Sequence, residues 1–82
     1  MSRLPVVSGE KLIKLLEKLG YSVVRQRGSH VRLEKSTSMG THKITVPYHD
    51  EISKGTLNDI LNKVSLWNGI PKKELIEMLK KL

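Results

Sequence analysis

The residues best equipped for chemistry in this chain lie together at Gly28, Ser29 and His30. Gly28 allows the backbone a tight turn or a close approach to a ligand, and Ser29 adds a small hydroxyl group. His30 carries the type of side chain that most readily exchanges a proton near neutral pH. Three guanidinium groups suited to holding phosphate surround this stretch, those of Arg25, Arg27 and Arg32. The cluster predicts a site that binds a nucleic-acid backbone and has the means to cut it.

Length and charge narrow the class of protein. A chain of 82 residues predicts a single domain over residues 1–82. Its 15 Lys and Arg against 8 Asp and Glu give a net charge of +7, which favours a polyanionic partner, with nucleic acid ahead of an acidic membrane surface or protein. The sequence has no cysteine, no apolar run of membrane-spanning length and no signal peptide. We therefore expect a cytoplasmic protein with no membrane association.

Two further histidines are candidates for different roles. His49 follows the last predicted strand and is the second candidate for proton transfer, although it could equally be a connecting residue that packs on Tyr48. His42 lies in a segment of small polar residues, where we expect it to be solvated. The chain lacks cysteine, and the adjacent Asp50 and Glu51 are too common a pair to indicate a metal. We expect no metal site and no other cofactor.

Other cations extend the predicted phosphate contacts. Lys43 lies on the solvent-exposed side of a predicted strand. Lys54, Gly55 and Thr56 lie at the predicted start of a helix, where backbone N–H groups and the helix dipole could hold a phosphate. A tight turn permitted by Gly55 explains the same residues equally well. Trp67 could stack on a base, but a single tryptophan in a loop before a helix is more typical of packing.

Apolar residues recur at helical spacing in three segments. The first covers residues 8–19, with Ser8 as its N-cap. The second has its cap at Ser53 or Thr56. The third follows Pro71, a residue suited to the first turn of a helix. The predicted apolar stripe of this third helix consists of Leu75, Met78, Leu79 and Leu82.

Three strands are predicted between the first two helices. Residues 21–26 are rich in β-forming side chains, but their pattern leaves open which face is buried. In residues 30–34 and 43–46 apolar and polar residues alternate, so each of these strands has one buried and one wet face. The small, polar residues 35–42 predict a flexible hairpin loop between them.

These elements predict an α+β fold. Short connections predict that the three-stranded sheet is antiparallel. Because only one face of the sheet is apolar, we expect both of the first two helices to pack on that face. A C-terminal helix completes the fold. The opposite face would be open to solvent and would carry His30, Arg32, Lys43 and Thr45.

The order of these elements, together with four stretches of sequence, resembles the HicA toxin family. The stretches are SGEKLIKLL from Ser8, VRQRGSH from Val24, ITVPYH from Ile44 and KGTL from Lys54. They cover nearly the whole chain up to about Val64, and the Gly-Ser-His stretch is the most diagnostic of them.

The resemblance implies a double-stranded-RNA-binding-domain-like α-β-β-β-α fold and an mRNA interferase, an endoribonuclease that cleaves mRNA and blocks translation. It also implies a HicB-like antitoxin as partner, with an oligomer of the complex left open. The catalytic histidine of the family falls on His30, and Ser29 and His49 are auxiliary candidates.

Two other functions remain open from the residues alone. A non-catalytic double-stranded-RNA-binding module would read RNA shape through 2′-hydroxyls and phosphates, and would need the basic residues more than the histidine. A regulatory protein could use the same basic surface to bind an acidic protein partner.

Overall fold

The computed structural model describes residues 4–82, which form three helices and three strands. In chain order these are α1 (Gly9–Lys18), β1 (Ser22–Arg27), β2 (His30–Thr37), β3 (Gly40–Pro47), α2 (Lys54–Asn68) and α3 (Lys72–Lys80). The strands form one antiparallel sheet in the order β1-β2-β3. The predicted α+β class, the α-β-β-β-α order and the additional C-terminal helix are confirmed.

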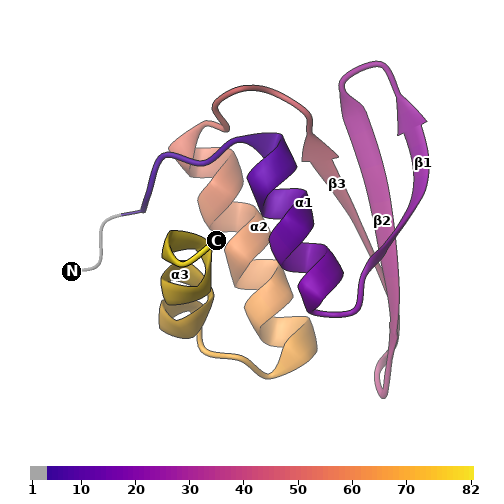
Figure 1. Cartoon of the computed structure of the whole chain (residues 1–82). Coiled ribbons are helices and arrows are strands. Elements are labelled where there is room, and N and C mark those ends of the chain that lie inside the picture. Colours follow the sequence, from indigo (N-terminus) through magenta and orange to yellow (C-terminus); the bar gives the residue numbers. More distant parts are fainter. Residues whose placement is uncertain (1–3) are drawn as a thin grey trace.

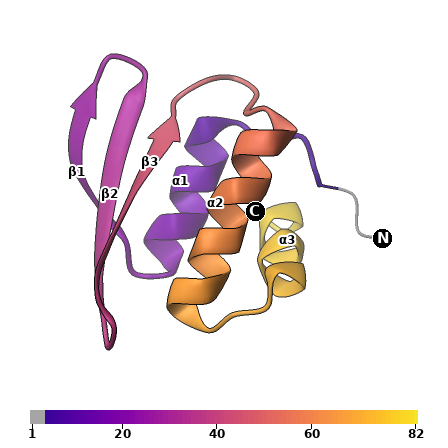
Figure 2. The same cartoon turned by 180° about the vertical axis from the view of Figure 1, so that it is seen from behind.

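The elements stack in three layers. Figures 1 and 2 show α1 and α2 between the sheet on one side and α3 on the other. α3 contacts both α1 and α2. One face of the sheet therefore carries no helix, and we call it the outer face. Within residues 4–82 no helix combines the length and apolar character needed to traverse a lipid bilayer.

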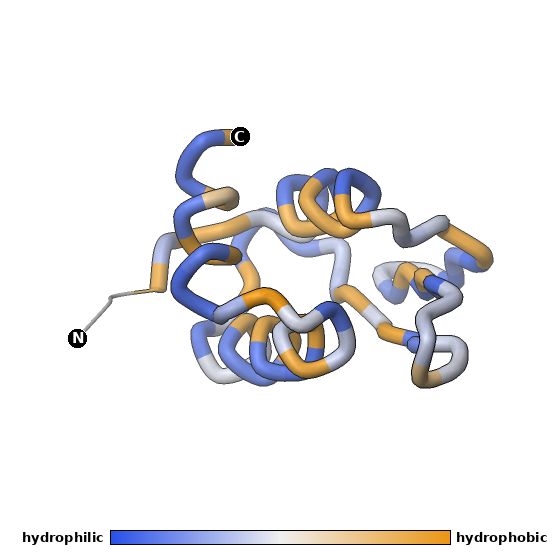
Figure 3. Tube along the Cα trace, turned by 90° about the horizontal axis from the view of Figure 1, so that it is seen from below, coloured by the Kyte–Doolittle hydropathy of each residue, from blue (hydrophilic) through white to orange (hydrophobic). Residues whose placement is uncertain are grey.

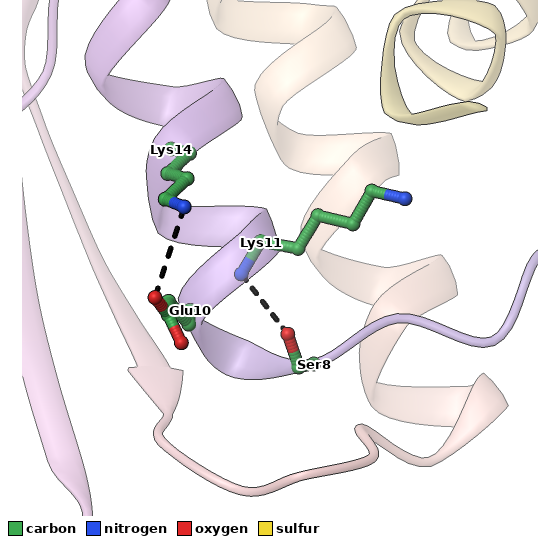
Figure 4. Close-up of polar contacts among 4 residues, drawn as sticks. All are labelled: Ser8, Glu10, Lys11 and Lys14. Atoms are coloured by element: carbon green, nitrogen blue, oxygen red, sulfur yellow. Dashed lines mark hydrogen bonds and ion pairs between the residues drawn. The ribbon is translucent and has the colours of Figure 1, made fainter. Parts of the chain in front are cut away.

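α1 begins where Ser8 caps it. The Lys11 backbone N–H donates a hydrogen bond of 3.1 Å to the Ser8 hydroxyl, which satisfies one of the free donors of the first turn (Figure 4). An exposed ion pair between Lys14 and Glu10 follows at 3.7 Å, of the kind that adds only a few tenths of a kcal/mol. The helix ends before Gly20, whose φ of 102° suits a residue without a Cβ. The predicted first helix is confirmed.

The core lies between the inner face of the sheet and the helices. β2 contributes Val31 and Leu33, and β3 contributes Ile44 and Val46, as their alternation predicts. Seen from below, the trace has hydrophobic and hydrophilic residues intermixed along every helix, as expected for helices with one buried side (Figure 3). Burial of the strands' inner side chains leaves alternate residues such as His30, Arg32 and Thr45 exposed on the outer face.

The apolar stripe of α3 differs from the predicted one. The buried side chains are Leu75, Ile76 and Leu79, whereas Met78 is 38% exposed. A helix turns by 100° per residue, so a buried side centred between Leu75 and Ile76 leaves Met78 toward solvent. Pro71 precedes the helix as its N-cap residue instead of lying in the first turn.

The predicted loop over residues 35–42 is wrong. β2 continues to Thr37 and β3 starts at Gly40, so only two residues connect them. The Thr37 hydroxyl donates to the Gly40 carbonyl at 2.7 Å and accepts from the Met39 N–H at 3.1 Å, and Gly40 has a φ of 119°. A local composition of small polar residues favours turns, but here the cross-strand ladder outweighs it.

The expectation of a solvated His42 is wrong for the same reason. Position 42 lies on β3, and its side chain is only 4% exposed. The Tyr21 hydroxyl shares a hydrogen bond of 2.6 Å with Nδ1 of His42 and accepts another from the Asn68 amide at 2.9 Å. The imidazole stacks on Trp67, with ring centroids 4.8 Å apart. Trp67 lies in α2, not in a loop, and it has the packing role expected of it.

We expect His42 to make folding sensitive to acid. Burial first, and the nearby Lys63 second, lower the pKa of His42 below 6.5, so the folded state favours the neutral ring that is hydrogen-bonded to Tyr21. The unfolded chain takes up a proton on this histidine at its ordinary pKa. The contribution of His42 to the free energy of unfolding is therefore complete above about pH 6.5 and decreases as the pH falls toward the lowered pKa of the folded state. Urea unfolding at about pH 7.5 and about pH 5 measures this. The decrease in the free energy of unfolding between the two pH values should be smaller in His42→Gln than in the wild type. The control His49→Gln, at an exposed position, should show the same decrease as the wild type. Equal decreases in wild type and both variants would contradict the role of His42.

Candidate functional site

The Gly-Ser-His stretch forms the tip of the β1–β2 hairpin. Arg27 pairs with His30, which leaves Gly28 and Ser29 as a two-residue turn. Gly28 has a φ of 58°, in the left-handed region that such turns require and that a glycine adopts without strain. The turn therefore sets His30 as the first residue of β2.

A bulge in β1 brings the arginines to the face of His30. Val23 pairs with Leu33, and the next pair is Arg25 with Arg32, so Val24 is an extra residue in β1. In a regular strand Arg25 would share the inner face with Val23. The extra residue shifts the alternation of inner and outer side chains along β1 by one position. Because directly paired residues share a face, Arg25 lies with Arg32 on the outer face. The same shift places Arg27 beside His30.

The other side of the turn is fixed by the segment after β3. The Tyr48 N–H donates to the Ser29 carbonyl at 2.6 Å, and the Gly9 N–H donates to the His49 carbonyl at 2.9 Å. A Cβ on Gly9 would lie 2.3 Å from the Pro47 carbonyl oxygen, so only glycine lets α1 approach this closely. The start of α1 thus anchors the strand end beside the Ser29–His30 turn, and the exposed His49 belongs to this anchored segment.

These local features create an open hollow on the outer face, which we call the His30 hollow. It is lined by Arg25, Arg27, His30, Arg32 and Thr45. All five residues are exposed. Thr45 pairs with Arg32 across the sheet and lies on the same face as His30, as the alternation of the third strand predicts. The hollow combines three cations, a proton-exchanging ring and a hydroxyl.

Two of the predicted phosphate contacts lie outside this hollow. Lys43 is on the outer face of β3 opposite Glu34, beyond the pair formed by Arg32 and Thr45. Lys54 is the first residue of α2, where the cap is the Ser53 side chain. Among residues 4–82, no three His, Asp or Glu side chains lie where they could share a metal ion.

The fold and the site together define a class of protein. It is a small α+β domain of the double-stranded-RNA-binding-domain-like arrangement, with a histidine and three arginines on the uncovered face of its sheet. The family described as "HicA toxin of bacterial toxin-antitoxin" matches residues 9–66, from the start of α1 almost to the end of α2. The chain belongs to the HicA toxin family, and membership implies pairing with an antitoxin.

The match stops before the last residues of α2, so α3 lies outside it. No curated protein and no solved structure gave a significant match to the chain.

Proposed function

We propose that this toxin is an endoribonuclease that cleaves mRNA and so blocks translation, with His30 as its catalytic residue. The observation that carries the proposal is the His30 hollow, which combines His30 with Arg25, Arg27 and Arg32 on an open sheet face. The arginines would hold the phosphate on either side of the cut, and Lys43 and Lys54 would contact flanking phosphates. The HicB-like antitoxin would cover this face to block the substrate.

The chemistry follows from the groups in the hollow. Neutral His30 removes the proton from a ribose 2′-hydroxyl, and the oxygen attacks the adjacent phosphorus. The bond to the 5′-oxygen of the next nucleotide breaks, leaving a 2′,3′-cyclic phosphate and a 5′-hydroxyl. Guanidinium groups stabilise the charge that builds up on the phosphorane oxygens. None of these steps requires a metal ion.

The leaving 5′-oxygen needs a proton from a second group. We propose that His49 supplies this proton, because the backbone hydrogen bond between Tyr48 and Ser29 holds the segment that contains His49 beside the Gly-Ser-His turn. Ser29 would assist through its hydroxyl. Protonated His30 could itself return the proton, in which case His49 would be dispensable.

A non-catalytic RNA-binding module is the second candidate, and the fold itself favours it, since the same arrangement serves shape recognition of double-stranded RNA. Incubation of purified protein with mRNA in the presence of a chelator, followed by gel electrophoresis, separates the two. We expect discrete cleavage products that persist in the chelator. An intact but retarded band, strongest with duplex RNA, would favour the binding module.

A further inference from the structure

A second hollow lies farther along β1 and β2 from the His30 hollow, where Glu34 lines it from the outer face and Lys35 from the inner side of the sheet. We call it the Glu34 hollow; it is lined by Gly20, Ser22, Val24, Glu34, Lys35, Ser36 and Thr41. Its volume of about 470 Å³ is in the range of sites that hold small ligands. Glu34 shares the outer face of β2 with His30 and Arg32, because the three alternate along one strand.

The chemistry of the Glu34 hollow differs from that of the His30 hollow. Glu34 is the only carboxylate in the three strands. It is half-buried, and although Lys43 is its direct partner in β3, no ion pair within residues 4–82 includes it. A free carboxylate repels phosphate and accepts hydrogen bonds. The hydroxyls of Ser22, Ser36 and Thr41 surround it with small polar groups.

The bulged residue links the two hollows. Val24 is 51% exposed and lines the Glu34 hollow, while its neighbour Arg25 lines the His30 hollow. An exposed apolar side chain next to a carboxylate matches a nucleobase, which has an apolar ring and a polar edge. The bulge thus directs two neighbouring side chains of β1 to different hollows, Val24 to one and Arg25 to the other.

We propose that the Glu34 hollow is a base-recognition subsite for guanine in single-stranded RNA. Guanine presents two neighbouring donors, N1–H and the 2-amino group, which match the two oxygens of a carboxylate. Uracil presents a single N–H between two carbonyl oxygens that Glu34 would repel. Glu34 is four residue steps along β2 from His30, about 13 Å at the usual rise per residue, so the recognised base lies within a few nucleotides of the cut.

This inference rests on the proposed function, and its test combines cleavage with binding. Cleavage is measured on RNAs in which each nucleotide near the cut is guanosine, inosine or uridine in turn. Inosine keeps N1–H and lacks the 2-amino group. We expect one position at which guanosine is preferred about tenfold in kcat/KM over uridine, with inosine between them. Glu34→Gln should remove that preference, while Glu17→Gln, an equal charge change at an exposed position of α1, should retain it.

Binding is measured with His30→Ala protein, by fluorescence anisotropy on oligoadenosine carrying one central guanosine, inosine or uridine. Tighter binding of the guanosine RNA that Glu34→Gln abolishes supports the subsite, even if wild-type protein cleaves nothing and the proposed function fails. Equal affinity for guanosine and inosine, or a preference unchanged in both Glu34→Gln and Glu34→Ala, overturns it. Thermal melts of each variant exclude loss of folding as the cause.

Discussion

Replacement of His30 by alanine is expected to lower the rate of RNA cleavage by about 10²–10⁴, the usual contribution of a proton-transfer group. His30 is exposed at the start of β2, and no hydrogen bond of its side chain holds the described part of the fold together. A surface substitution of this kind should change the free energy of unfolding by less than about 1 kcal/mol. His30→Ala should therefore lose cleavage activity while it keeps nearly the stability of the wild type.

The measurement compares wild type, His30→Ala and His49→Ala on the same RNA, with thermal melts alongside. His49→Ala should be slowed as well if it supplies the proton to the leaving oxygen, and should cleave normally if His30 does so alone. An equally stable His30→Ala protein that cleaves at the wild-type rate would remove His30 from the mechanism and direct attention to His49.

Affinity for single-stranded RNA is expected to fall steeply with salt. Five proposed phosphate contacts, by Arg25, Arg27, Arg32, Lys43 and Lys54, predict a slope of about −3.5 for log affinity against log salt, from about 0.7 per phosphate contact. A fourfold rise in salt should then weaken binding by roughly 130-fold. Fluorescence titrations at several salt concentrations measure the slope, with His30→Ala protein used to keep the RNA intact.

Single substitutions locate the contacts. Arg32→Ala should weaken binding and flatten the slope to about −2.8, the value for four contacts. Lys81 directly follows α3, the helix on the side of α1 and α2 away from the sheet. Lys81→Ala removes the same charge as Arg32→Ala but far from the outer face, so it should leave the slope unchanged. A slope near zero in the wild type would show that the basic face is only hydrated.

Patterns that repeat within one element were predicted correctly from the sequence. Ser8 and the apolar spacing after it defined the first helix, and the alternation around Ile44 and Val46 gave the inner face of β3. The same reasoning put His30 on the wet side of its strand, where the structure has it. Each of these features depends on a local period and on burial of one side.

Features that depend on pairing between distant residues were not predictable in this way. The bulge at Val24 exists only relative to the register of β2, so the sequence left the phase of β1 open. His42 is buried because Tyr21 and Trp67, each at least 21 residues away along the chain, meet around it. Polar composition alone therefore gave a loop where the structure has a continuous hairpin.

In the proposed reaction a ribose 2′-hydroxyl, activated by His30, attacks the adjacent phosphate without a metal ion. The most direct measurement uses a short RNA containing a cleavage site and a matched RNA with a single 2′-deoxyribose at the cut, both incubated with wild-type protein in excess chelator. We expect cleavage of the first RNA to a 2′,3′-cyclic phosphate and a 5′-hydroxyl, and no cleavage of the second. Cleavage of the 2′-deoxy substrate at the same bond, or products with a 5′-phosphate, would contradict it.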